Sequence, residues 1–129
     1  MVERIENTPL EECEGIVESV ALEEGINRPQ YHVVIDATNV EIGGTTGKLH
    51  EWIPMSPKST EESVPQGSVV DRYLTQIEIC ISAAKKAVTV SDAFDLTVGK
   101  KFKWKKLKLG KDYDGHPAKE YWAPVSLIE

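Results

Sequence analysis

Residues Ser68–Lys86 read SVVDRYLTQIEICISAAKK, and only here do apolar side chains recur at the spacing of an amphipathic helix. Ser68 followed by Asp71 has the form of a capping box, and two lysines would lie at the negative end of the helix dipole. We therefore predict a helix over residues 69–86. Its apolar face would consist of Val70, Tyr73, Leu74, Ile77, Ile81 and Ala84.

Three segments before this helix have the character of β-strands. Glu14–Leu22 is apolar and rich in β-branched residues, and Gly15 would permit a bulge or tight curvature. Tyr31–Ala37 alternates, so that its odd-numbered residues share one face. Gly43–Gly47, GGTTG, is a turn, and Leu49–Pro54 reads as a third strand that pairs back as a hairpin.

Two strands are predicted after the helix. The first lies in Lys100–Lys111, KKFKWKKLKLGK, where the large apolar residues switch from even to odd positions. An extra residue at Lys105–Lys106, as in a β-bulge, would return them to one face and leave the lysines on the other. The second strand, Lys119–Ile128, contains Pro124, which suits an edge strand or a bulge. The large apolar residues that switch positions within Lys100–Lys111 are Phe102, Trp104, Leu107 and Leu109.

This order of three strands, a helix and two further strands is the layout of the oligonucleotide/oligosaccharide-binding (OB) barrel. We expect an all-β domain, a five-stranded OB-type barrel with one helix between strands three and four. It would occupy residues 13–129, behind a flexible acidic lead formed by residues 1–12. A ferredoxin-like or cystatin-like α+β sheet is the alternative architecture.

Two short motifs after the helix resemble those of a known family. The sequence LTVGKKFK, Leu96–Lys103, combines a leucine, a Gly-Lys pair and an aromatic strand, and WAPV, Trp122–Val125, contains a closing Pro-Val. Both are similar to the end of OB domains in archaeal and phage single-stranded-DNA-binding proteins of the replication protein A-like type. The resemblance implies a nucleic-acid-binding barrel, or a protein-docking barrel, since such groups contain both.

The charges of this 129-residue chain are distributed unevenly. Seven of its 15 basic residues fall between Lys100 and Lys111, a segment that contains none of the 21 acidic residues. A row of lysines with aromatic residues between them predicts contact with a polyanion, nucleic acid first. The net charge of −6 argues against a general coat for duplex DNA and leaves protein partners open. Lysines on an edge strand also prevent strand-on-strand aggregation, which is the alternative interpretation of this row.

In an OB barrel the ligand crosses strands two and three and is held by the loops that join strands one to two and four to five. Aromatic side chains there would stack on bases, and lysines would release counterions from phosphates. If Trp52 faces outward, Glu51 must be buried or lie near the rim; if it faces inward, Trp52 belongs to the core, as we expect for Trp104 and Trp122. The residues nominated in this way are Arg28, Tyr31, His32, His50, Trp52, Lys101, Lys103, Lys105, Lys106, Lys108, Lys111, Tyr113 and His116.

Other functional classes lack a motif in this sequence. The start of the chain is acidic, so it does not predict a secretory signal, and the apolar runs are too short for a membrane span. Cys13 and Cys80 are expected as reduced, partly buried thiols, and three dispersed histidines do not predict a metal site. No nucleophile–base pair and no phosphate- or dinucleotide-binding fingerprint is present, so neither an enzyme nor a cofactor is predicted.

The leading hypothesis is a cytoplasmic, non-catalytic module that binds single-stranded nucleic acid with its lysine-rich strand and exposed aromatic residues. The second hypothesis is a protein-interaction OB barrel that serves as an accessory subunit of a larger complex. An enzyme on a β-barrel scaffold is the third class. Whether Trp52 and the lysines share one exposed face is the observation that bears most directly on this choice.

Overall fold

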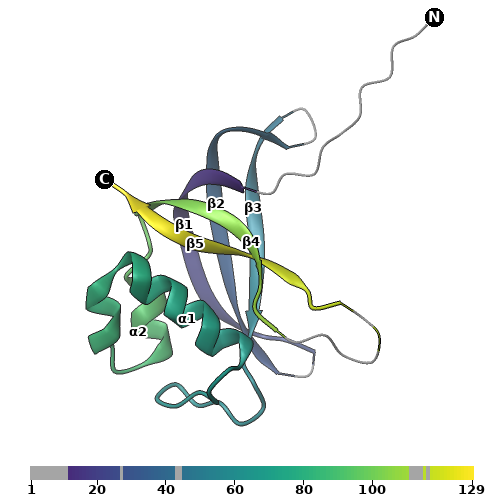
Figure 1. Cartoon of the computed structure of the whole chain (residues 1–129), viewed down its shortest axis with the longest axis vertical. Coiled ribbons are helices and arrows are strands. Elements are labelled where there is room, and N and C mark those ends of the chain that lie inside the picture. Colours follow the sequence, from purple (N-terminus) through teal and green to yellow (C-terminus); the bar gives the residue numbers. More distant parts are fainter. Residues whose placement is uncertain (1–11, 27, 43–44, 111–114, 116) are drawn as a thin grey trace, which may run out of the picture.

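The computed structural model describes residues 12–26, 28–42, 45–110, 115 and 117–129. Five strands form one antiparallel sheet in the order β3-β2-β1-β4-β5, and the helices gather on one side of it (Figure 1). The prediction of five strands with a helix between the third and the fourth is therefore confirmed. The strands are β1 (Glu12–Glu24), β2 (Pro29–Ile42), β3 (Thr45–Pro54), β4 (Lys101–Lys108) and β5 (Glu120–Ile128).

The helical region between β3 and β4 is more divided than the sequence predicted. The expected helix over 69–86 ends at Cys80, because Ile81 has an extended backbone with φ −130° and ψ 99°. A 3-10 turn, η1 (Ser82–Lys86), follows, and its last turn carries the two lysines that were expected at the end of α1 (Val69–Cys80). A second short helix, α2 (Val90–Asp95), occupies a stretch that the sequence analysis had not assigned.

The capping box at the start of α1 has the predicted form. The Asp71 backbone N–H donates to the Ser68 hydroxyl oxygen at 3.3 Å. The Asp71 carboxylate in turn accepts the Gly67 backbone N–H at 2.7 Å. The first bond satisfies a donor that the first turn of a helix would otherwise leave without a partner, and the second holds the residue before the N-cap, so together they fix where α1 begins.

The core lies between the inner face of the sheet and one face of α1. Val70, Tyr73 and Ile77 are buried on this helix face, as its periodicity predicted. The Tyr73 hydroxyl donates to the Trp122 carbonyl oxygen at 2.8 Å, which ties α1 to β5. Because α1 packs against both β5 and β3, it covers the region between the two outermost strands of the sheet.

Glu51 connects these two strands through its side chain. Within the described residues no backbone ladder joins β3 to β5, so the sheet is not closed there. The Glu51 side chain is buried, and its carboxylate accepts the backbone N–H of Trp122 at 3.0 Å and that of Trp52 at 3.2 Å. Lys119 lies 3.7 Å away and supplies a partner of opposite charge. A buried carboxylate with these partners takes the place of strand pairing at this point.

The strand irregularities do not lie where the sequence placed them. Gly15 has no bulge, but a Cβ atom there would lie 2.6 Å from Ile35 Cγ2, so glycine permits the close approach of β1 to β2. The register shift of β1 against β2 comes at Glu18, and that of β4 against β5 comes at Val125, beside Pro124. The bulge predicted at Lys105–Lys106 is therefore wrong.

The side-chain pattern that motivated that bulge is nevertheless present. Phe102, Trp104 and Leu109 are buried and Leu107 is half-buried, whereas both lysines between them are exposed. The alternation of burial is therefore interrupted at Lys105 and Lys106 without an extra residue at that point in the pairing of β4 with β5. Pro124 lies in β5 at the sheet edge, where a residue without a backbone N–H costs no ladder bond on the open side.

Candidate functional site

The outer face of β2 and β3 carries a group of aromatic and imidazole side chains. Trp52 lies opposite His32 in the β2–β3 register, and His50 lies opposite Val34, the next outward position along β2. Trp52 is 38% exposed, so it faces outward, and Glu51 is only 6% exposed. Of the two orientations that the sequence left open, the structure has the one in which Trp52 faces outward and Glu51 is buried.

The three rings of His32, His50 and Trp52, which we call the ring platform, are stacked. The His32 and Trp52 ring centroids are 4.6 Å apart with an angle of 10° between the planes. His50 stacks on His32 at 5.1 Å and on Trp52 at 5.9 Å. His32 Nε2 and His50 Nδ1 are hydrogen-bonded at 2.9 Å. These contacts hold the rings nearly parallel and present a flat, partly exposed surface of the kind on which a planar group stacks.

Glu23 of β1 holds the ring platform from the side. Its carboxylate accepts the Trp52 indole N–H at 3.2 Å, and His32 Nδ1 lies 3.2 Å from its other oxygen. If His32 donates from Nδ1 to this carboxylate and is neutral, its Nε2 is left to accept the hydrogen of His50 Nδ1. Glu23 could not be nominated from the sequence, because its position depends on the register shift at Glu18.

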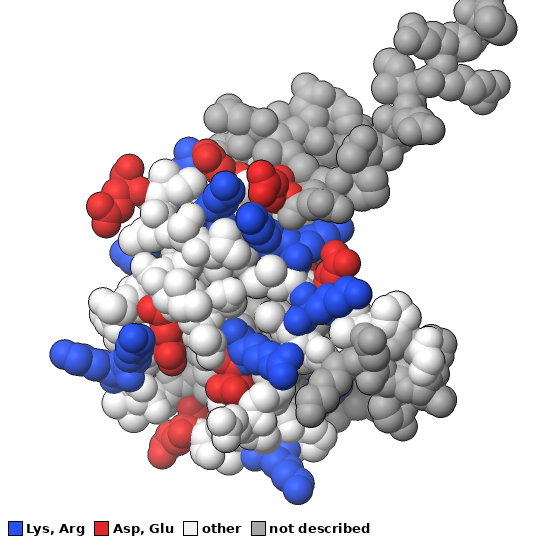
Figure 2. Space-filling model, in the orientation of Figure 1, with Lys and Arg blue, Asp and Glu red and all other residues white. Residues whose placement is uncertain are grey.

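The lysines of β4 form a second cluster, and the register with β1 places Lys101, Lys103 and Lys105 on the outer face. Lys101 is half-buried, and the other four lysines of the strand are exposed. The Lys101 ammonium lies 3.7 Å from the Glu14 carboxylate, and that of Lys105 lies 3.9 Å from Glu12, so β1 neutralises part of this charge. Figure 2 shows basic and acidic side chains interspersed on the face where β4 and β5 lie nearest the viewer. The exposed set is Lys103, Lys105, Lys106 and Lys108.

The two clusters share the outer face of the sheet but lie at different ends of β1. Lys103 pairs with Glu14 and His32 pairs with Ala21, and the extra residue at Glu18 keeps both positions on the outer side. Seven residues of strand separate them, which corresponds to roughly 20 Å. An extended nucleic-acid strand of several nucleotides would span this distance, whereas a single nucleotide would not reach both clusters.

Tyr31 was nominated as a ligand contact, and the structure corrects that prediction. It is 1% exposed and stacks on Phe94, with ring centroids 4.3 Å apart. Its hydroxyl donates to the Glu61 carboxylate at 2.6 Å and lies 2.7 Å from the Ser91 hydroxyl. The pKa of Tyr31 is raised well above its ordinary value, mainly by burial and next by the hydrogen bond to Glu61. As an odd-numbered residue of β2, Tyr31 faces the core.

The remaining nominated residues lie at the ends of the sheet. Arg28 is exposed in the connection between β1 and β2 and borders two surface clefts. Lys111, Tyr113 and His116 lie outside the described residues. The ammonium of Lys106, on β4, lies 5.4 Å from the centroid of the Trp122 ring, so this buried tryptophan has one face toward the lysine cluster.

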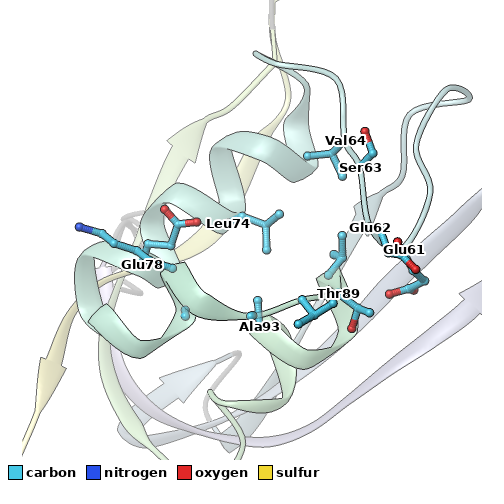
Figure 3. Close-up of a pocket in the computed structure, with 13 residues that line it drawn as sticks. Glu61, Glu62, Ser63, Val64, Leu74, Glu78, Thr89 and Ala93 are labelled. Atoms are coloured by element: carbon cyan, nitrogen blue, oxygen red, sulfur yellow. The ribbon is translucent and has the colours of Figure 1, made fainter.

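A separate hollow lies among the helices, away from the sheet. It has a volume of about 130 Å³ and is bordered by the loop before α1 and by both helices (Figure 3). Val88, which is 74% exposed, borders this hollow and a second, apolar one. Acidic residues border both hollows, together with Lys85 at the first and Lys86 at the second, and no sequence motif indicated either hollow. These acids are Glu61, Glu62, Glu78, Asp92 and Asp95.

The cysteines and histidines show no further site in the part of the chain that is described. Cys13 and Cys80 are free thiols; burial raises the pKa of Cys13 to about 11, which disfavours the reactive thiolate. Among the described residues no three His, Cys, Asp or Glu side chains are grouped so that they could hold a metal ion. In the same residues no helix is both long and apolar enough to cross a membrane.

Comparison of this sequence with models of known protein families and with curated proteins finds no match.

Proposed function

We propose that this protein is a non-catalytic module that binds single-stranded nucleic acid across the outer face of its sheet. The observation that carries the proposal is the ring platform, which is held in place from below by β2 and β3 and from the side by Glu23. A surface of parallel, partly exposed rings suits unpaired bases, since every base has a π-face. Duplex DNA keeps its bases stacked and would not offer them to this surface.

The lysines of β4 would supply the electrostatic part of binding. Four of them are exposed, and Lys103 and Lys105 lie on the same side of the sheet as the ring platform. Lysines that neutralise phosphates release counterions, which makes affinity fall as salt rises. The acidic residues of β1 beside the lysines would limit this attraction, so we expect modest affinity, micromolar or weaker.

The OB-type barrel is part of the same proposal. Its support is the strand order with β1 at the centre, the helix between β3 and β4, and the Glu51 bridge between β3 and β5. In an OB barrel those two strands close the sheet, and the outer face of strands two and three binds the ligand. The ring platform would then occupy the OB ligand face.

The direct test is a fluorescence-anisotropy titration of a labelled dodecathymidylate, dT12, at several salt concentrations. With about four phosphates neutralised, the slope of log K against log salt should be near −3, or about a fiftyfold loss of affinity between 50 and 200 mM salt. A 12-base-pair duplex of mixed sequence serves as the control and should bind more weakly. Absence of dT12 binding at 50 mM salt would contradict the proposal that the sheet binds single-stranded nucleic acid.

A second candidate function is protein docking through the helical side. Its specific observation is Val88, exposed between two hollows whose linings contain five acidic residues as well as Lys85 and Lys86. Apolar surface bordered by carboxylates is complementary to a basic amphipathic helix of a partner protein. A synthetic Leu/Lys amphipathic peptide should shift the amide NMR signals of α2 and η1, and a V88D variant should not respond. Shifts confined to the sheet would contradict this function.

A further inference from the structure

A cleft of about 330 Å³ opens where β1, β2 and β3 reach the helical side of the molecule. Its apolar walls are formed by Leu22, Pro29, Met55 and Pro57. The cleft lies at the ends of the strands that carry the ring platform, because Leu22 belongs to β1, Pro29 begins β2 and Met55 directly follows β3. Its volume lies near the lower end of small-ligand pockets, which span roughly 300–1,000 Å³, and so suits a single nucleotide rather than a longer segment.

Arg28 is the cationic group of this cleft. No carboxylate of the described residues lies within ion-pair distance of its guanidinium, although the chain is acidic overall. A guanidinium has five N–H donors in a fixed planar fork and no acceptor. The Arg28 guanidinium therefore has no carboxylate partner within the described part of the protein and remains available to a ligand.

Two further side chains restrict what the cleft can accept. The Ser59 hydroxyl oxygen is buried at the wall of the cleft and has no hydrogen-bond partner among the described residues. Glu61 also borders the cleft, but one of its oxygens accepts from Tyr31 and from Ser91, and the other accepts the Ser91 backbone N–H. The carboxylate is committed to these partners, and the hydroxyl oxygens of Ser56 and Thr60, which also border the cleft, accept backbone N–H groups of Lys58 and Glu62. The Arg28 guanidinium is thus the exposed charged donor of the cleft.

We propose that this cleft binds one unstacked guanine base, with Arg28 donating to its O6 and N7 atoms. Apolar walls suit the faces of a base, and guanine presents two acceptors on one edge at the spacing of the guanidinium fork. Adenine has a donor in place of O6, and thymine has no adjacent pair of acceptors. The inference rests on the proposed function, because the base would belong to the strand that crosses the ring platform.

The test compares three labelled oligonucleotides by anisotropy: dT12, dT12 with one central guanine, and the same strand with 7-deazaguanine at that position. We expect wild type to bind the guanine strand about tenfold more tightly than dT12. The 7-deaza strand, which lacks the N7 acceptor, should bind like dT12. Arg28→Lys keeps the charge but not the fork, and it should abolish the preference.

Arg72→Ala is the matched control, because it removes the same charge as Arg28→Ala from a helix that does not border the cleft. It should keep the full guanine preference, whereas Arg28→Ala should lose it. If dT12 binds but guanine gives no gain, or if Arg28→Ala retains the gain, the guanine site is wrong and the proposed function stands. If no strand binds at 50 mM salt, both are wrong. Binding of the guanine strand alone would support the cleft and remove the ring platform.

Discussion

Tyr31 and His32 are consecutive residues of β2, and their environments are opposite. Tyr31 points to the inner face, where it is 1% exposed and stacks on Phe94. His32 points to the outer face and stacks on Trp52, which is itself partly exposed. The same alternation divides β3, where Glu51 is buried and its neighbour Trp52 is exposed. One sheet therefore has an inner face that packs and an outer face that is free to contact a ligand.

This difference implies that stability and binding should respond to different substitutions. Inner residues such as Ile77 fill space that no other group can fill, so truncating them leaves a cavity. Outer residues such as the β4 lysines lie in water in the free protein, so removing them costs little stability. Each substitution below should change one property and leave the other nearly unchanged.

The largest effect is expected on the inner side. Ile77→Ala should cost about 2–5 kcal/mol of unfolding free energy, because Ile77 is fully buried on the face of α1 that packs against the sheet. Ile79→Ala, on the same helix but 65% exposed, is the control and should cost under about 1 kcal/mol. Urea denaturation measures both. Equal costs would mean that α1 does not face the sheet as described.

The next effect concerns the outer lysines. Replacing Lys103, Lys106 and Lys108 together by Ala should weaken dT12 binding at least about 100-fold at 50 mM salt and reduce the salt slope from about −3 to about −1. The thermal midpoint should change little. Replacing Lys58, Lys85 and Lys86, which are equally exposed elsewhere, removes the same charge and should preserve most of the affinity. A similar loss in both variants would show that net charge, not position, governs binding.

A smaller effect is expected from the ring platform. Trp52→Ala should remove about 1–3 kcal/mol of binding free energy, the contribution of stacking on one base. The salt slope should stay at the wild-type value, because stacking releases no counterions. Trp52→Phe retains a ring and should recover part of the affinity. A changed slope in Trp52→Ala would mean that the tryptophan positions a lysine instead of contacting a base.

The smallest effect concerns Tyr31, the residue whose side of the sheet was mispredicted. Tyr31→Phe removes the hydrogen bond to Glu61 and should cost about 1 kcal/mol of stability at pH 7 while leaving dT12 binding unchanged. A clear loss of dT12 affinity in this variant would mean that the Tyr31 hydroxyl contributes to binding.

The pH dependence of Tyr31→Phe follows from Glu61. Burial raises the pKa of Glu61, but bonds from Tyr31 and Ser91 outweigh it and hold the pKa below its ordinary value near 4.5. The ionised form therefore stabilises the fold above about pH 4.5, and this contribution is lost as the pH falls through the lowered pKa. Tyr31→Phe should lose less stability than wild type on acidification. Parallel pH curves from urea denaturation would contradict this assignment.

Much of the fold follows from local patterns in the sequence. The helical spacing of Val70, Tyr73 and Ile77 and the alternation of β2 each depend on residues that are close in the chain. The early end of α1 and the register shifts at Glu18 and Val125 depend on packing between distant segments. Such packing has no local signal, which is why the helix was predicted too long and the bulge on β4 was misplaced.

The candidate site divides in the same way. His50 and Trp52 were predictable from an assumed hairpin, and the lysines from composition alone. Glu23 was not, because a glutamate in an acidic chain carries no signal until the register places it beside Trp52. Tyr31 was nominated because it is an aromatic residue near the predicted loop. Its burial depends on Phe94 and Glu61, which lie far along the chain.

The most direct test of the outer-face account is an NMR titration of isotopically labelled protein with dT12. The account predicts that amide signals of β2 and β3 around His32 and His50, the Trp52 indole signal and the amide signals of Lys101–Lys108 shift together. Signals of α1 and α2 should remain in place. Shifts confined to the helices, or no shifts at 50 mM salt, would contradict the claim that the outer face of the sheet binds single-stranded nucleic acid.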